Sequence, residues 1–249
     1  KTMAADGSRR QQTAADGSSN LGASTTAKGI VMIRVGRVGT SPLLMNAMDK
    51  DTLLRLVTGE KAPKGAPKGT PLEQATKRLY LDATGKKVIM PVQNVLASMI
   101  EAGRRVRMEG KTQVSTASST ILPSFLTIEE SELALVDPKD NKKQARWAED
   151  IMLGRNPNGG EAVGICRPRF NEWAFYMTLS ADLSTVPERI VRELVYRAGT
   201  HVGLCDFRPQ RKGTFGRFRI DEWKIEPGTE DTAGSGAEEG EGSDEADPT

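Results

Sequence analysis

The segment from Gly203 to Arg219 concentrates residue types that can contact a polyanion. Glycines let backbone amides approach a phosphate closely, cations supply charge, and aromatic rings such as those of Phe207, Phe215 and Phe218 can stack on bases. The residues of this segment predicted to bind nucleic acid are Gly203, Arg208, Arg211, Lys212, Gly213, Gly216 and Arg217. The alternative is a surface loop whose arginines are solvated and whose phenylalanines anchor it in the core.

Other polar residues flank the first strand and the first long helix that the sequence predicts. They are basic and can contact the phosphates of a nucleic-acid backbone. The predicted contact residues outside the loop are Arg34, Arg37, Arg104 and Arg105.

The charge of the chain is unevenly distributed. Nine of its 33 acidic residues lie from Glu226 onward, where there is no Lys or Arg, so residues 1–225 carry a net charge of +11. A basic body of this kind favours a polyanionic partner, and an acidic tail can compete for the same surface. An ordinary basic surface with a solubilising tail is the alternative.

The chain has one histidine and two cysteines, which leaves little material for metal or nucleophile chemistry. His201 is expected near a helix end, where a structural role or an interaction with the helix dipole is the usual one. Cys166 and Cys205 lack the paired spacing of a metal site and are expected to be core thiols. The sequence therefore predicts no metal and no cofactor.

Three acidic residues after the first strand leave a nuclease as an open alternative. Asp49, Asp51 and Asp82 could hold a catalytic metal, but none of them lies in a specific motif. We therefore expect a protein that is not an enzyme.

Hydrophobic spacing predicts an α+β fold. Two helices with apolar faces, over 91–106 and 186–198, alternate with β-rich runs. In chain order the core elements are a strand (30–38), a helix (91–106), two strands (162–170 and 173–180), a helix (186–198) and a strand (215–225). Asn171 and Glu172 are predicted to join the two middle strands as a hairpin. This βαββαβ order is that of a ferredoxin-like core.

Composition divides the chain into three parts. Residues 1–28 are rich in Ala, Ser, Thr and Gly and are expected to form a flexible arm, and residues 227–249 an acidic disordered tail. Between them, residues 29–226 are expected to form the nucleic-acid-binding domain, with insertions at about 42–90 and 108–160. Within the first insertion, the apolar spacing predicts a helix from Leu43 to Leu56, either continuous or broken near Asp49.

Two short segments resemble the RAMP superfamily of CRISPR-associated proteins. The stretch VIMPVQNVLASMIEAGRR, from Val88 to Arg105, resembles the turn that begins a helix with basic residues at its end. The glycines of the Gly203–Arg219 segment resemble the late glycine-rich loop that is the hallmark of the superfamily. Pro91, Gln93, Asn94, Arg104 and Arg105 occupy the place of the first motif, so the resemblance implies that Gln93 and Asn94 also contact the nucleic acid. Val92 and Gln93 stand where a Gly and a Ser are expected, so the first motif is degraded.

The resemblance implies a non-catalytic subunit that binds RNA without sequence preference and oligomerises along a guide RNA, beside other effector subunits. It also implies that the segment from Lys111 to Lys143 contacts the next copy. The stretches SPLLMN and FGRF resemble phage-encoded proteins, so a phage protein that binds or anneals single-stranded DNA is one alternative, and a structural assembly protein is another. No secretory signal or apolar span is visible, so no membrane contact and a cytoplasmic location are expected.

Overall fold

The computed structural model of the chain describes residues 29–61, 69–108, 110, 112–155, 160 and 162–227. The helices are α1 (Lys50–Thr58), α2 (Pro71–Thr76), α3 (Val92–Gly103), α4 (Glu188–Arg197), the π-helix η2 (Ala198–Val202) and the 3-10 helices η1 (Leu122–Ser124) and η3 (Pro209–Arg211). The strands are β1 (Ile30–Gly39), β2 (Leu43–Leu44), β3 (Ile89–Pro91), β4 (Leu126–Ile128), β5 (Glu132–Ala134), β6 (Val136–Asp137), β7 (Asp140–Gln144), β8 (Ala148–Arg155), β9 (Ala162–Phe170), β10 (Ala174–Asp182) and β11 (Phe218–Pro227). The expected arm (1–28) and all but the first residue of the expected tail lie outside the described residues.

The main sheet confirms the α+β fold class and has a ferredoxin-like core. Its strand order is β11-β1-β10-β6-β7, and β4 also pairs with β10. The first strand therefore lies between the last strand and β10, and these pairings are antiparallel. With α3 between β1 and β4, and α4 between β10 and β11, the chain follows the βαββαβ order.

The second strand of this core is β4, and the prediction that residues 162–170 fill that place is wrong. They form β9, which pairs with β8 and β2 in a separate three-stranded sheet. The expected hairpin across Asn171 and Glu172 does not form, because the chain leaves one sheet there and enters the other. Trp173 turns into the core, where its Nε1 donates to the Ser41 carbonyl oxygen at 2.8 Å.

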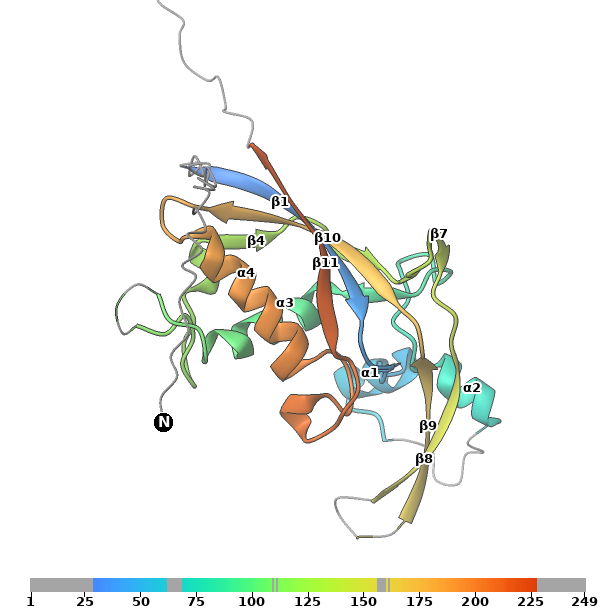
Figure 1. Cartoon of the computed structure of the whole chain (residues 1–249). Coiled ribbons are helices and arrows are strands. Elements are labelled where there is room, and N and C mark those ends of the chain that lie inside the picture. Colours follow the sequence, from blue (N-terminus) through green and yellow to red (C-terminus); the bar gives the residue numbers. More distant parts are fainter. Residues whose placement is uncertain are drawn as a thin grey trace, which may run out of the picture.

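The expected insertion at 108–160 is thus partly core. Its strands β4 and β6 both pair with β10, and β7 extends the main sheet beyond β6. The β8 strand of the same region pairs with β9 to form a long hairpin that projects away from the main sheet (Figure 1).

Helices α3 and α4 lie together on one side of the main sheet (Figure 1). Their apolar faces supply the side chains that the sequence predicted, among them Val95 and Met99 of α3 and Ile190 and Leu194 of α4, all buried in one core with Ile33 of β1. Fully burying one such side chain contributes about 1.5–3 kcal/mol. The packing of these two helices fixes where their carboxyl ends lie.

Two predicted helix boundaries are wrong. The helix expected from Leu43 starts only at Lys50, because Leu43 and Leu44 pair with β9 and are fully buried. The second predicted helix does not end near Gly199, since α4 continues as η2 and the chain turns at Gly203 with a φ of 78°. None of the helices formed by the described residues is both long and apolar enough to cross a membrane.

Candidate nucleic-acid interface

Residues 203–217, the glycine loop, follow η2 and fold back on themselves. The Leu204 amide donates to the Gly216 carbonyl at 2.9 Å, and the Phe215 amide donates to the Phe207 carbonyl at 3.0 Å. The Gly216 amide donates in turn to the Pro42 carbonyl, at 2.8 Å, which ties the loop to the connection after β1. The loop is therefore a closed, hydrogen-bonded structure.

The glycines of this loop are needed for its own closure. A Cβ on Gly213 would overlap the Phe207 carbonyl, and a Cβ on Gly216 would overlap the Leu204 carbonyl oxygen. Gly216 also has a φ of 71°, which favours glycine. The close approach predicted from sequence thus exists, but it is made to the backbone of the loop itself.

Backbone strain is concentrated in the same loop. Cys205, Phe207 and Lys212 have φ values of 57°, 49° and 62°, and among the described residues they are the non-glycine residues with positive φ. Such conformations persist only where the surroundings impose them, and they gather at functional sites.

Asp206 anchors the glycine loop to two other elements. Its carboxylate accepts hydrogen bonds from Asn46 Nδ2, at 3.2 Å, and from Arg167, which is buried on β9. Its own amide donates to the Leu44 carbonyl oxygen at 3.0 Å. The Arg167 guanidinium also lies 5.4 Å from the centre of the Phe207 ring. The loop is therefore held at a fixed position against β2 and β9.

The structure brings three of the predicted contact residues together. Asn94 and Arg208 line a cavity of about 180 Å³ with Tyr80, and both also line a smaller pocket beside Gly203. Arg208 is partly buried there, and its Nη1 donates to the Cys205 carbonyl at 2.7 Å. The Ser98 hydroxyl of α3 lies 3.1 Å from the Gly203 carbonyl, so α3 positions this side of the loop.

A second group of cations gathers around η2. Desolvation lowers the pKa of His201, and the positive charges of Arg197, Arg105 and Arg217 lower it further. These arginines come from the carboxyl ends of α4 and α3 and from the start of β11, three elements that border η2. Arg197 is paired with a carboxylate, that of Glu193 at 2.7 Å. Convergence of like charges of this kind attracts an anion.

The remaining predicted residues lie outside these two groups. Arg211 and Lys212 are exposed at the tip of the glycine loop, and Gln93 is exposed at the start of α3. Arg104 forms an ion pair with Glu101, with 3.1 Å between its Nη1 and the Glu101 Oε1. Arg34 is exposed on the sheet face opposite the helices, beside Tyr176 and Glu222, because alternation turns it away from the buried Ile33 and Val35.

The prediction that Arg37 lies on a binding surface is wrong. Its side chain is buried, with the guanidinium 5.5 Å from the centre of the Phe175 ring and 5.7 Å from that of Phe218. Nη1 donates to the Val35 carbonyl at 3.2 Å, whereas Nε and Nη2 have no hydrogen-bond partner among the described residues. Burial lowers the pKa of this guanidinium to about 9, against a small opposing effect of Glu130.

The acids and thiols weighed from the sequence have structural roles. Asp49 caps α1, and Asp82 accepts hydrogen bonds within the 82–87 turn, which lower its pKa. Burial raises the pKa of the Cys205 thiol to about 12. Asp51 is exposed on α1. Across the described ranges, no three His, Cys, Asp or Glu side chains gather as a metal site.

Sequence reasoning missed Asn46, Arg78 and Arg167, the partners that fix the loop. They lie in three segments far apart in the chain, and although Asn46 ends the SPLLMN stretch, nothing in the sequence links it to Arg78 or Arg167. A local signal did exist for α2, where Thr70 and Glu73 form a capping box.

In comparisons with known proteins, no protein-family model matches the sequence, and no curated protein matches it. Among solved structures, the chain is similar to a chain of "Type III-B Cmr-beta bound to cognate target RNA", with 7% identity, a TM-score of 0.45, and coverage of 79% of this chain and 61% of that one. It is also similar to Cmr6 from Pyrococcus furiosus, with 11% identity, a TM-score of 0.36, and coverage of 77% and 98%. The chain thus spans about three fifths of the first of these chains.

Proposed function

We propose that this chain is a non-catalytic subunit that binds RNA largely without sequence preference. The observation that carries the proposal is that Arg105, Arg197 and Arg217 gather around η2, which also contacts the η3 turn of the glycine loop with its further cations. Phosphates are the shared feature of every RNA sequence, so a surface of this kind binds the backbone rather than particular bases.

The geometry of the glycine loop supports the same proposal. A closed loop anchored through Asp206 and Ser98 holds Arg208, Arg211 and Lys212 at defined positions, so little ordering entropy is lost when a strand binds. The partly buried Arg208 beside Asn94 can donate to a phosphate or a sugar hydroxyl in the adjoining cavity.

The finer proposal is an oligomer that assembles along a guide RNA with other effector subunits, in a CRISPR effector-like ribonucleoprotein in the cytoplasm. It rests on the two sequence segments that resemble RAMP proteins and on the ferredoxin-like strand order. In this proposal residues 29–226 form the RNA-binding domain, and the acidic segment after them modulates binding through its charge. Native mass spectrometry on RNAs of increasing length tests the assembly, since an oligomer of this kind adds one chain for each fixed increment of length.

RNA binding itself is tested by fluorescence anisotropy with several single-stranded RNA sequences at two or more salt concentrations. Charge reversal at Arg211, Lys212 and Arg217 together is expected to weaken binding more than tenfold and to reduce the salt slope by about 2, because each phosphate contact to a single strand contributes about 0.7. A matched control reverses three exposed cations outside the glycine loop and outside the 111–143 segment, Lys86, Lys87 and Arg146, and so changes the net charge by the same amount. Its affinity is expected to stay within about twofold of the parent.

Two outcomes would overturn the proposal. Equal effects of the two triple variants would show that net charge alone acts, and a flat salt response would show that phosphates are not contacted. Competition between RNA and DNA of one sequence separates RNA binding from the alternative of a single-stranded-DNA-binding or annealing protein, which would prefer DNA or not discriminate.

A further inference from the structure

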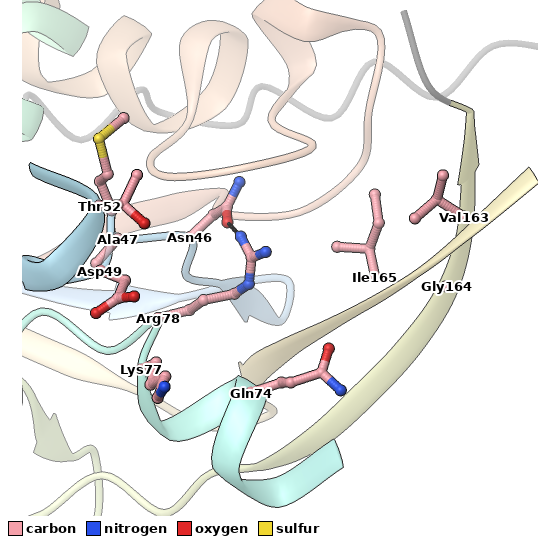
Figure 2. A pocket seen from close by; sticks show the side chains of 11 residues that line it. Asn46, Ala47, Asp49, Thr52, Gln74, Lys77, Arg78, Val163, Gly164 and Ile165 are labelled. Atoms are coloured by element: carbon pink, nitrogen blue, oxygen red, sulfur yellow. Dashed lines mark hydrogen bonds between the residues drawn. The ribbon is translucent and has the colours of Figure 1, made fainter. Parts of the chain in front are cut away.

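A groove of about 530 Å³ opens between α1, α2 and β9, next to the glycine loop, and none of the predicted nucleic-acid contacts lines it (Figure 2). Its size is that of a small-ligand site. It is lined by Asn46, Ala47, Met48, Asp49, Thr52, Gln74, Lys77, Arg78, Val163, Gly164 and Ile165.

Arg78 projects from the end of α2 into this groove, toward Asn46 (Figure 2). Its Nη1 donates to the Asn46 side-chain oxygen, whose amide nitrogen donates to Asp206 at 3.2 Å. The Asp206 carboxylate is already matched by the buried Arg167. The hydrogen-bond partner of Arg78 is therefore a neutral amide, which fixes its position. With Lys77 and Arg78 against the Asp49 carboxylate, the charged residues that line the groove carry a net charge of +1, so the groove can still hold an anion.

The opposite wall of the groove differs in chemistry. Val163, Gly164 and Ile165 of β9 face Arg78 across the groove, and the two branched side chains are partly exposed (Figure 2). No atom lies within 4 Å of the position that a Cβ on Gly164 would take. The wall with Arg78 can thus hold an anion, and the wall formed by β9 can pack against the face of a flat ring such as a nucleobase.

The groove is joined to the cavity that holds Arg208. Asn46 lines both, and Asp206, which accepts from Asn46, belongs to the glycine loop. A strand whose phosphates contact Arg208 can therefore continue past Asn46 to Arg78.

We infer that the groove between α1, α2 and β9 binds one nucleotide of the single-stranded RNA, with its phosphate at Arg78 and Lys77 and its base against Val163 and Ile165. The inference rests on the proposed function and extends it to a site at which a base is accommodated. Contact with the base there is through its face, so any of the four bases fits.

The test uses the full chain and single-stranded RNA that carries 4-thiouridine at single positions. Arg78→Ala is expected to weaken binding 5- to 30-fold and to lower the salt slope by about 0.7, while Arg146→Ala, which removes an exposed arginine outside the groove, is expected to change affinity less than twofold. Val163→Trp enlarges a partly exposed side chain that already lines the groove and is expected to weaken binding without a change in salt slope, since it removes no charge.

Crosslinking followed by mass spectrometry supplies a direct readout, because the thio-base is expected to react with the peptide that contains residues 162–166. Binding that is lost in the glycine-loop triple variant, but unchanged in both groove variants and without a crosslink to this peptide, would overturn the inference and leave the proposed function standing. Absence of RNA binding by the parent chain would overturn both. Melting curves of the two groove variants identify any loss that comes from unfolding.

Discussion

Arg37→Met is expected to stabilise this protein. The wild-type guanidinium is about 1% exposed and keeps its charge among Phe175, Phe218 and the aliphatic core, with Nε and Nη2 lacking partners in the described structure. Methionine fills a similar volume without a buried charge and adapts to irregular gaps. Replacing a buried charge by an apolar side chain of similar size is often neutral or favourable.

The expected gain is a difference between opposing contributions. Each unpaired buried donor costs about 1–3 kcal/mol, so two of them cost about 2–6 kcal/mol. Against this, methionine loses the hydrogen bond to the Val35 carbonyl and two cation–π contacts at 5.5 and 5.7 Å, of about 0.5–2 kcal/mol each. These contributions largely offset one another, so we expect the free energy of unfolding at pH 7 to rise by about 0–2 kcal/mol.

The pH dependence of the free energy of unfolding provides a second, independent test of the buried charge. Because burial lowers the pKa of Arg37 from 12.5 to about 9, the unfolded chain binds more protons than the folded chain between those two pH values. The stability of the wild type therefore rises with pH in that window relative to the methionine variant, by about 1.4 kcal/mol for each pH unit above 9. Below pH 9 the difference between the two proteins is constant.

Urea unfolding of both proteins, followed by circular dichroism at pH 7 and pH 10, measures both quantities. Arg37→Ala serves as a control for volume and is expected to be less stable than Arg37→Met because it leaves a cavity. A methionine variant less stable than the wild type by 1 kcal/mol or more, or a difference equal at the two pH values, would refute the reasoning about this buried charge.

Three further predictions concern carboxylates. Asp206→Ala leaves the buried Arg167 without its partner and is expected to lower the free energy of unfolding by about 3 kcal/mol, as measured by urea unfolding. The pKa of Asp182 is lowered to about 2 by hydrogen bonds from Ser184 and Thr185, so its contribution is complete above pH 4 and is lost as pH falls through 2; Asp182→Asn should flatten the acid limb of a stability profile in that range. Deletion of residues 228–249, which removes eight acidic residues and no basic one, is expected to tighten RNA binding in anisotropy titrations at low salt, and an unchanged affinity would show that the segment does not compete.

The helical half of the fold could be predicted from the sequence because its signals are local. The apolar positions of α3 and α4 repeat at the helical period, and the same residues are buried in the structure. The pairing of the strands could not be predicted in the same way, because it depends on contacts between distant segments. A two-residue connection between residues 162–170 and 174–182 is a strong local hairpin signal, but β8 and β2 compete for β9 and are far from that connection in the sequence.

The candidate site shows the same division. The glycine loop and Asn94 could be found from composition and motif, and the structure places Asn94, Gly203 and Arg208 together. Arg34 and Arg37 were assigned to one surface, although residues three apart in a strand point to opposite faces, and Arg37 follows Ile33 and Val35 inward. The positive charge of both residues favours an exposed position, whereas the alternation of side chains along a strand places them on opposite faces.

The contacts that hold the loop were beyond prediction from sequence. Asn46, Arg78 and Asp206 meet only because β2, α2 and the glycine loop pack against one another, and no spacing in the chain indicates those contacts.

The pairing of β1 with β11 also governs how the chain is made. Gly39 is matched with Phe218, so the strand synthesised first must wait for the strand synthesised last. At about 5–20 residues per second, that wait is roughly 10 to 35 seconds on the ribosome. For most of that time both edges of β1 are open to strands of other nascent chains, because β10, its other neighbour, is also synthesised late in the chain. Expression yield should therefore depend on chaperones that shield this first strand during translation.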